Sequence, residues 1–552
     1  MSADRAQSVG YAAHPATGIA WVEVGVVVLA VAVFAYLAGS FAGQQAIWVD
    51  EATQLSGLAL PLGEQLAWLA GRSDVVLGVP PDRMPPLSYW IGSLWAAVFG
   101  LSENAMRWMG IAATCAAAPA LYLAGRRTGG RAGAVFVLGL TLFSGNIIVQ
   151  AGDIRAYPLY FTFAAWAVYF FVRLVCDDDK EGETRRLVLL CLFLLLATYT
   201  HFFGLVAAAC ILAALCLDRL LKRRRIAPVM ATGCAFGLLS VGIVPFVLAA
   251  IGVSNDGAGT VGIGELSWSV ARLVFRLVVH PSQMVVTSVL AAFLLGLAVL
   301  FGILLLRLRT AGAQSSRQGE HAARELSWIN AAVLAAPIVL ALTVLMAAKL
   351  IVNSFEVLAP HYNVWLVPLP GIVLALAFRN TGAGGNLRPA ALAAGGVVIL
   401  CGVVGVVSLQ RHAQLYLHGP AEWVAGQIHD PENTLIIHDG AGHLGQLYFP
   451  LYFLTQGAVE QWKHDKDNDQ FRRVIPNGSE PVTDPQTRLK DFDTVMEVYT
   501  VGMDSAELAA VARGERSCEF GMEDRPVSPA AAMSPASYFC AFFATRLTTV
   551  RQ

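Results

Sequence analysis

Apolar runs long enough to cross a membrane recur along most of this chain, and they limit its fold more than any other feature. A bilayer core about 30 Å thick requires about 20 apolar residues of α-helix. Of the 552 residues, 56% are hydrophobic and 14% are charged, whereas soluble domains carry about a quarter charged residues. The sequence therefore predicts a polytopic α-helical membrane protein. Its net charge of -1 argues against a nucleic-acid partner.

About eleven runs are predicted to span the membrane, the first of them as a retained signal anchor. They lie at 18–39, 105–125, 131–149, 156–175, 187–203, 204–217, 227–251, 284–306, 329–352, 363–378 and 390–409. The segment MPPLSYWIGSLWAAVFG (84–100) is apolar but shorter. We expect it to form an interfacial or re-entrant juxtamembrane helix, with tryptophans at headgroup depth.

Every second loop between these runs is basic. Lysines and arginines cluster within 126–131, 173–186, 219–225, 307–324 and 379–388. Since basic loops stay in the cytoplasm, the loop 41–104 and the region after residue 409 are expected on the other side. This is the periplasmic side if the membrane is a bacterial inner (plasma) membrane, which is the location we predict.

The chain changes character near residue 410, where strand-like runs (TLIIHDG, TVMEVYT) and charged turns (HDKDND) begin. We expect residues 1–409 to form the transmembrane domain and residues 410–552 to form an extracytoplasmic α/β domain. Cys518 and Cys540 are the only cysteines in this second region. In an oxidising compartment they are expected to pair as a disulfide.

Polar and aromatic residues from distant loops are predicted to meet at the outer membrane boundary. They are Asp50, Glu51, Asp82, Arg83, Asp153, Arg155, Tyr157, Tyr199, His201, Lys349, Glu356, His361 and Tyr362. Ionisable residues at membrane depth indicate functional sites. A carboxylate can take the proton of an attacking hydroxyl, and cations can offset the charge left on a departing phosphate. The set therefore favours transfer of a group from a lipid phosphate.

Five short motifs resemble a known superfamily in their order, spacing and predicted side. They are VDEA (49–52), PPLSYW (85–90), SENAMRW (102–108), DIRAYPL (153–159) and TYTHFFG (198–204). Together they are similar to the GT-C glycosyltransferases that use polyprenyl-phosphate sugars, such as the protein O-mannosyltransferases and the aminoarabinose transferase of lipid A. The resemblance rests on motifs up to residue 204 and on topology beyond it.

The resemblance implies that Asp50 is the base for the acceptor hydroxyl and that Glu51 helps to bind the acceptor. The residues assigned to the donor or its phosphate are Asp153, Arg155, Tyr157, Arg83, His201, His361 and Tyr362. Two positions depart from the family pattern. Met84 follows Arg83 where the family often has His or Lys before the two prolines, and His361–Tyr362 stands where an Arg-Tyr pair is common.

The sequence thus predicts an integral membrane hexosyl- or pentosyltransferase. It would move a sugar from a polyprenyl-phosphate donor to a lipid, polysaccharide or protein acceptor of the cell envelope. No cofactor is assigned, and a role for a divalent metal stays open. The alternatives are a ligase that transfers a glycan from polyprenyl diphosphate and a lipid or glycan transporter. Transporters often have internal repeats and mid-membrane polar sites, whereas the polar residues of this chain gather at the outer boundary.

Overall fold

The computed structural model describes residues 20–43, 45, 47–72, 81–177, 181–251, 263–278, 287–318, 321–352, 357–379, 387–412, 424–426, 428–439, 444–465, 470–475, 478–502 and 543–551. Most of them are helical. The α-helices before residue 420 are α1 (Trp21–Ala42), α2 (Val49–Leu58), α3 (Leu62–Leu69), α4 (Leu87–Phe99), α5 (Glu103–Leu142), α6 (Gly145–Gly152), α7 (Tyr157–Cys176), α8 (Glu183–Thr200), α9 (Phe203–Leu221), α10 (Ala227–Leu239), α11 (Val244–Ile251), α12 (Ile263–Val278), α13 (Thr287–Gln318), α14 (His321–Val352), α15 (Pro368–Ala375) and α16 (Arg388–His412). Short 3₁₀ segments are η1 (Ser240–Ile243), η3 (Pro360–Leu366) and η4 (Leu376–Phe378).

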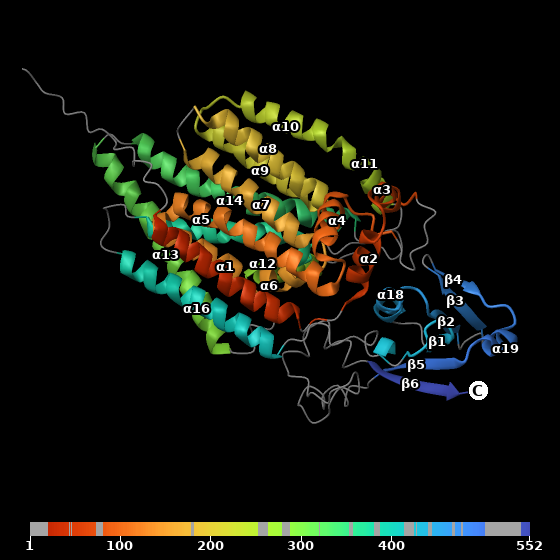
Figure 1. Ribbon diagram of the computed structural model, residues 1–552. Helices are drawn as coiled ribbons and strands as arrows, with labels where there is room; N and C mark the ends of the chain where they lie inside the picture. Colours follow the sequence, from red (N-terminus) through yellow and green to blue (C-terminus); the bar gives the residue numbers. More distant parts are fainter. Residues whose placement is uncertain are drawn as a thin grey trace, which may run out of the picture.

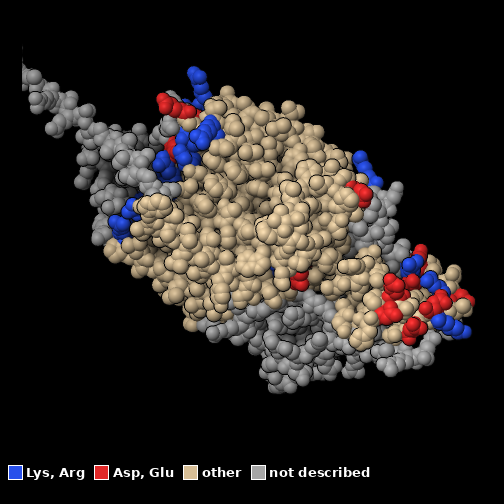
Figure 2. All heavy atoms as spheres, in the orientation of Figure 1, with Lys and Arg blue, Asp and Glu red and all other residues tan. Residues whose placement is uncertain are grey.

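Within the described residues, nine helices are long and apolar enough to cross a membrane. They are α1, α5, α7, α9, the α10–α11 segment, α13, α14, the η3–η4 segment and α16. In Figures 1 and 2 they form one helical body whose flank carries few charged side chains. Apolar side chains of these helices, such as Leu29 of α1, Leu238 of α10 and Leu400 of α16, are exposed, as expected of surfaces that face lipid. The prediction of a polytopic helical membrane protein is confirmed.

Two further predicted spans correspond to the second half of α5 and to α8. The chain folds back within α5 at Gly130, whose φ of 68° is left-handed and favours glycine. The two limbs touch closely, because a Cβ on Gly125 would lie 2.5 Å from the carbonyl oxygen of Gly133. Helix α8 has 18 residues and begins with Glu183 and two arginines, so it is less apolar than the nine. With both included, the structure agrees with the expected number of spans.

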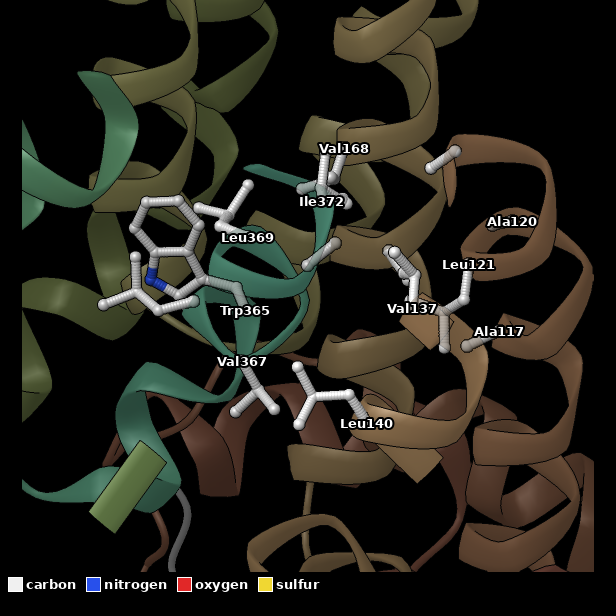
Figure 3. Close-up of a cluster of buried hydrophobic side chains, with 14 of the residues drawn as sticks. Ala117, Ala120, Leu121, Val137, Leu140, Val168, Trp365, Val367, Leu369 and Ile372 are labelled. Carbon is white, nitrogen blue, oxygen red and sulfur yellow. The ribbon is translucent and has the colours of Figure 1, made fainter. Parts of the chain in front are cut away.

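The core of the helical body joins both limbs of α5 to α7 and to the η3–α15 segment. Figure 3 shows Leu121 and Val137 from the two limbs close together, with Val168 of α7 and Ile372 of α15 nearby. The second limb continues into α6, which ends at Gly152. The turn after α6 carries the DIRAY motif, so this core determines where that motif emerges from the body.

Helix α4 has 13 residues, or about 20 Å at 1.5 Å per residue, and is too short to cross the hydrocarbon core. The prediction of a short helix in this segment is confirmed. Helices α2, α3 and α4 lie at the same end of the body as the C-terminal sheet (Figure 1).

The C-terminal region contains a six-stranded sheet in the order β4-β3-β2-β1-β5-β6. The strands are β1 (Thr434–Asp439), β2 (Glu460–Asp465), β3 (Gln470–Ile475), β4 (Gly478–Pro481), β5 (Thr494–Gly502) and β6 (Phe543–Arg551). Strand β1 is parallel to β2 and β5, and the other pairs are antiparallel. Helix α18 (Leu444–Leu454) connects β1 to β2; the short α19 (Pro485–Arg488) and η5 (Leu489–Asp491) precede β5. The expected α/β character is confirmed. Cys518 and Cys540 lie outside the described residues, and the boundary at 410 stays a prediction.

Several of the basic loops meet at the end of the body away from the sheet (Figure 2). The buried carboxylate of Asp177 pairs there with Arg127, Arg173 and Arg186, which come from three of the helices. The carboxylate of Glu23 in α1 pairs with two more arginines of α5. The basic clusters and the helix that carries Asp50 therefore lie at opposite ends of the helical body, as the alternation of basic loops predicts.

Candidate active site

The first turn of α2 carries Asp50 and Glu51, where carboxylates interact favourably with the helix N-terminus. Consecutive residues of an α-helix point about 100° apart, so the two side chains face different surroundings. The side chain of Asp50 is 41% exposed, whereas that of Glu51 is 1% exposed. A ligand can therefore reach the carboxylate of Asp50 but not that of Glu51.

Arg155, in the turn between α6 and α7, is held directly beside Asp50. Its Nη2 lies 3.7 Å from Oδ2 of Asp50. Its Nη1 donates to the backbone oxygen of Asp50 at 3.1 Å and to the carboxylate of Asp82 at 3.0 and 3.2 Å. The hydroxyl of Tyr89 also donates to Asp82, at 2.8 Å. Arg155 is only 8% exposed, and its Nε has no hydrogen-bond partner among the described residues. The arginine is thus fixed in place, and its buried Nε–H is left without a hydrogen bond in the described part of the chain.

Glu51 is part of a buried ion pair with Arg107 of α5. Nη1 and Nη2 of Arg107 lie 2.7 and 3.1 Å from the two oxygens of Glu51. The same carboxylate accepts the backbone N–H of Ile154 at 2.9 Å and of Trp48 at 3.4 Å. Arg107 also donates to the backbone oxygen of Gly152 at 2.8 Å. These bonds join α2, α5 and the turn before α7, and they occupy the carboxylate that sequence reasoning assigned to the acceptor.

Asp153 lies in the same buried network. The indole N–H of Trp48 donates to its Oδ1 at 3.2 Å. Burial and the neighbouring Glu51 carboxylate raise the pKa of Asp153 well above its ordinary value, although Arg155 and Trp48 act in the opposite direction. These surroundings therefore favour the protonated form of Asp153 more than those of an ordinary aspartate do.

The carboxylate of Asp50 is a stronger base than an isolated aspartate. The surrounding protein removes part of its hydration and so raises its pKa, and the negative charges of Asp82 and Glu51 raise it further, while the adjacent Arg155 lowers it. A general base works best when its pKa is closer to the working pH, and perturbed carboxylates of this kind are typical of catalytic sites. Asp50 is therefore suited to accept a proton.

Four other predicted site residues form one aromatic cluster. The ring of Tyr157 lies 5.5 Å from that of His201, 5.2 Å from that of His361 and 6.1 Å from that of Tyr362. The Nδ1 of His201 accepts the backbone N–H of Phe203 at 3.2 Å. Burial, with the charge of Arg155, lowers the pKa of His201 to about 3. His201 is therefore neutral and can donate through Nε2 only.

Arg83 is the next residue in the chain after Asp82, whose carboxylate holds Arg155. Its φ of 50° is left-handed, a conformation that costs energy in a residue other than glycine and is concentrated at functional sites. The side chain is half-buried. Among the residues that the structure describes, Arg83 has no ion-pair partner.

Sequence reasoning missed the roles of Arg107, Asp82 and Tyr89. Arg107 and Tyr89 lie inside the motifs SENAMRW and PPLSYW, and Asp82 is within the predicted outer set, so the signal was present. The motifs do not show which residue each of these side chains contacts. In the described part of the chain, no group of three or more His, Cys, Asp or Glu side chains is arranged to hold a metal ion.

Comparison with known proteins agrees with this architecture. Residues 83–248 match the family model for dolichyl-phosphate-mannose-protein mannosyltransferases. Among solved structures, ArnT from Cupriavidus metallidurans in the apo state is 16% identical, with a TM-score of 0.55, over 90% of this chain and 96% of ArnT. ArnT bound to undecaprenyl phosphate is 15% identical, with a TM-score of 0.51, over 88% of this chain and 94% of ArnT. No curated protein matches the chain. The predicted resemblance and the GT-C fold are confirmed.

Proposed function

We propose that this protein is an integral membrane glycosyltransferase that transfers a sugar from a polyprenyl-phosphate carrier to a cell-envelope acceptor on the outer side of the membrane. The observation that carries the proposal is an accessible carboxylate, Asp50, held 3.7 Å from a nearly buried arginine, Arg155. The family model over residues 83–248 and the fold of an ArnT that binds undecaprenyl phosphate support the same carrier class.

In the proposed reaction, the acceptor hydroxyl attacks the anomeric carbon of the donor sugar while Asp50 takes its proton. The bond between the anomeric carbon and the phosphate oxygen breaks, and the electron pair remains on the departing polyprenyl phosphate. A nearby cation stabilises the charge that develops on this phosphate. The base, Asp50, and the nearby cation, Arg155, lie side by side at the same end of the helical body.

The charges of the site indicate which cations are needed. Arg155 is partly neutralised by Asp82 and Asp50, so a departing phosphate would be stabilised further by a second cation. Arg83 supplies a second permanent cation next to Asp82. We therefore assign the donor phosphate to Arg155 and Arg83, with Tyr157, His201, His361 and Tyr362 as uncharged hydrogen-bonding and ring contacts. Glu51 and Asp153 are assigned to positioning Asp50 and Arg155 rather than to either substrate.

The donor class is tested by substituting Arg155. Arg155→Ala should weaken binding of a short-chain polyprenyl phosphate by about tenfold or more, because hydrogen bonds to a charged group contribute about 1.5–3 kcal/mol. Arg155→Lys should recover only part, since lysine lacks the planar fork. Binding is measured by calorimetry with the short-chain polyprenyl phosphate alone, and turnover is measured with the corresponding polyprenyl-phosphate sugar.

The control is Arg185→Ala, which removes an exposed arginine from the start of α8 and should leave the dissociation constant unchanged. A nucleotide sugar and a polyprenyl-diphosphate sugar are offered to the wild-type protein as competing donors. Turnover with the nucleotide sugar alone, or unchanged binding by Arg155→Ala, would contradict the proposal. Turnover with the diphosphate alone would identify a glycan ligase instead.

The pH profile gives an independent test of Asp50. It must be ionised to accept a proton, so kcat/KM should fall as the pH drops through its raised pKa. The acid limb should therefore lie above the range of an ordinary aspartate, about pH 3.9. Removing the cation in Arg155→Ala should move this limb to higher pH, because Arg155 lowers the pKa of Asp50. Asp82→Asn removes a negative charge and should move it to lower pH. Limbs that coincide in all three proteins would exclude Asp50 as the titrating base.

A further inference from the structure

Helix α18 of the C-terminal region packs against the helix that carries Asp50. Helix α2 contacts α18 more extensively than it contacts α3 or α4, and α18 lies next to α2 in Figure 1. At the end of α18, Phe453 and Leu454 pack against the apolar cluster that includes Ala52 and Leu55 of α2. The C-terminal region is thus in direct contact with the helix of the proposed base.

The other side of α18 is fixed to the sheet. Leu451 is fully buried with Ile436 of β1 and Val459. The side chain of Gln461 in β2 bonds to Nε2 of His438 at 2.7 Å and donates to the backbone oxygen of Tyr448 in α18 at 3.4 Å. Helix α18 therefore contacts both the apolar cluster that includes Ala52 and Leu55 of α2 and the core of the C-terminal sheet.

The end of α18 is held in a defined turn. The N–H of Gly457 donates to the backbone oxygen of Tyr452 at 2.8 Å. The φ of Gly457 is 75°, and a Cβ there would lie 2.7 Å from the ring of Tyr452, so a larger residue would strain the backbone and displace this ring. Leu454, just before this turn, packs against the cluster under α2 and against the core between α18 and the sheet. The position of Phe453 and Leu454 is thus set by the sheet.

Helix α2 depends on such contacts for its position. It has 10 residues, and an isolated helix shorter than about 12 residues is marginal in water. Its inner face is fixed by Glu51 and Arg107, while α18 supports a further part of its surface. A catalytic group must be held within about 0.5 Å of its productive position. Loss of the α18 contact should therefore affect Asp50 more than the fold of the helical body.

We infer that α18 is a positioning element of the active site, in which Phe453 and Leu454 hold α2 so that Asp50 stays beside Arg155. The role of Asp50 in this inference rests on the proposed function. The effect of the α18 contact on the position of α2 does not depend on that function. It gives the C-terminal region a part in turnover, through α2, that does not require this region to touch the donor.

The test compares two half-buried phenylalanines of the C-terminal region. Phe453 packs against the cluster that includes Ala52 and Leu55 of α2, whereas Phe471 of β3 packs against the cluster that includes Leu435 and Ile437. The second cluster lies on the opposite face of the sheet, since neighbouring residues of β1 alternate between faces. Hydrogen exchange of the peptide covering 49–58 is measured in the full chain. Phe453→Ala should raise its exchange rate at least several-fold, and Phe471→Ala should leave it unchanged.

Turnover is then measured on the same variants. A misplacement of 1 Å can cost about 100-fold in rate, so Phe453→Ala should lower kcat by about ten- to a hundredfold with little change in the KM for the donor. Phe453→Leu should recover most of it. Equal effects of Phe453→Ala and Phe471→Ala, or unchanged exchange over 49–58, would overturn the inference. If Phe453→Ala raises exchange but the wild type uses no polyprenyl-phosphate sugar, the proposed function fails and the coupling stands.

Discussion

Asp50→Asn should lower sugar transfer by about 10² to 10⁴-fold, because that is the usual contribution of a positioned general base. Asparagine keeps the size of the side chain and its place in the first turn of α2, but it cannot accept the proton of the acceptor hydroxyl. The amide also keeps a hydrogen-bonding oxygen towards Arg155. The loss should therefore appear in kcat with the binding of polyprenyl phosphate largely retained. The measurement is turnover of a short-chain polyprenyl-phosphate sugar by the purified protein.

Glu64→Gln is the matched control for this substitution. Glu64 lies in α3 of the same predicted outer loop, and its side chain is exposed. The change is equally conservative, and it should leave turnover unchanged. Near-normal transfer by Asp50→Asn, with an unaltered unfolding profile, would remove Asp50 from the role of base. A comparable loss in Glu64→Gln would mean that the loop as a whole, and not one carboxylate, is sensitive to charge.

The architecture was predictable because hydrophobic length and loop charge are properties of single segments. The runs at 156–175 and 390–409 became α7 and α16 within a few residues. The fold-back in α5 was also visible, since two apolar runs are separated by arginines and glycines. The C-terminal strands β1 and β5 follow the two strand-like runs. Pairing of β1 with β2 and β5 was not readable, because parallel pairing depends on contacts between segments far apart in the chain.

The different surroundings of Asp50 and Glu51 could not be read from an acidic pair alone. Whether a carboxylate faces ligand or protein depends on where a short helix begins and on what packs against each of its sides. The deciding residue is Arg107, which lies 56 positions away from Glu51 and inside a segment chosen as a membrane span. A buried arginine in a span requires a buried anion, and this requirement is the signal that could have identified the pair.

Arg107→Met should destabilise the protein by about 3–5 kcal/mol, because it leaves the buried carboxylate of Glu51 without its partner. The double variant Glu51→Gln with Arg107→Met should recover most of this loss, because the second carboxylate that Arg107 contacts, Glu103, is 31% exposed and can be hydrated. The introduced glutamine also retains an oxygen for the N–H of Ile154. The free energy of unfolding is measured by denaturant titration of the detergent-purified protein, followed by tryptophan fluorescence.

A double-mutant cycle separates the pair from its surroundings. If the ion pair serves to position Asp50, the double variant should be close to the wild type in stability yet lower in turnover, because an amide and a thioether cannot reproduce the bonds that join α2 to Gly152. Arg185→Met, at an exposed arginine of α8, should change neither quantity. Additive effects of the two substitutions would show that Glu51 and Arg107 do not act as a pair. A double variant with full stability and full turnover would leave the pair with no role in the reaction, and the position of Asp50 would then have to depend on Arg155 and the packing of α2.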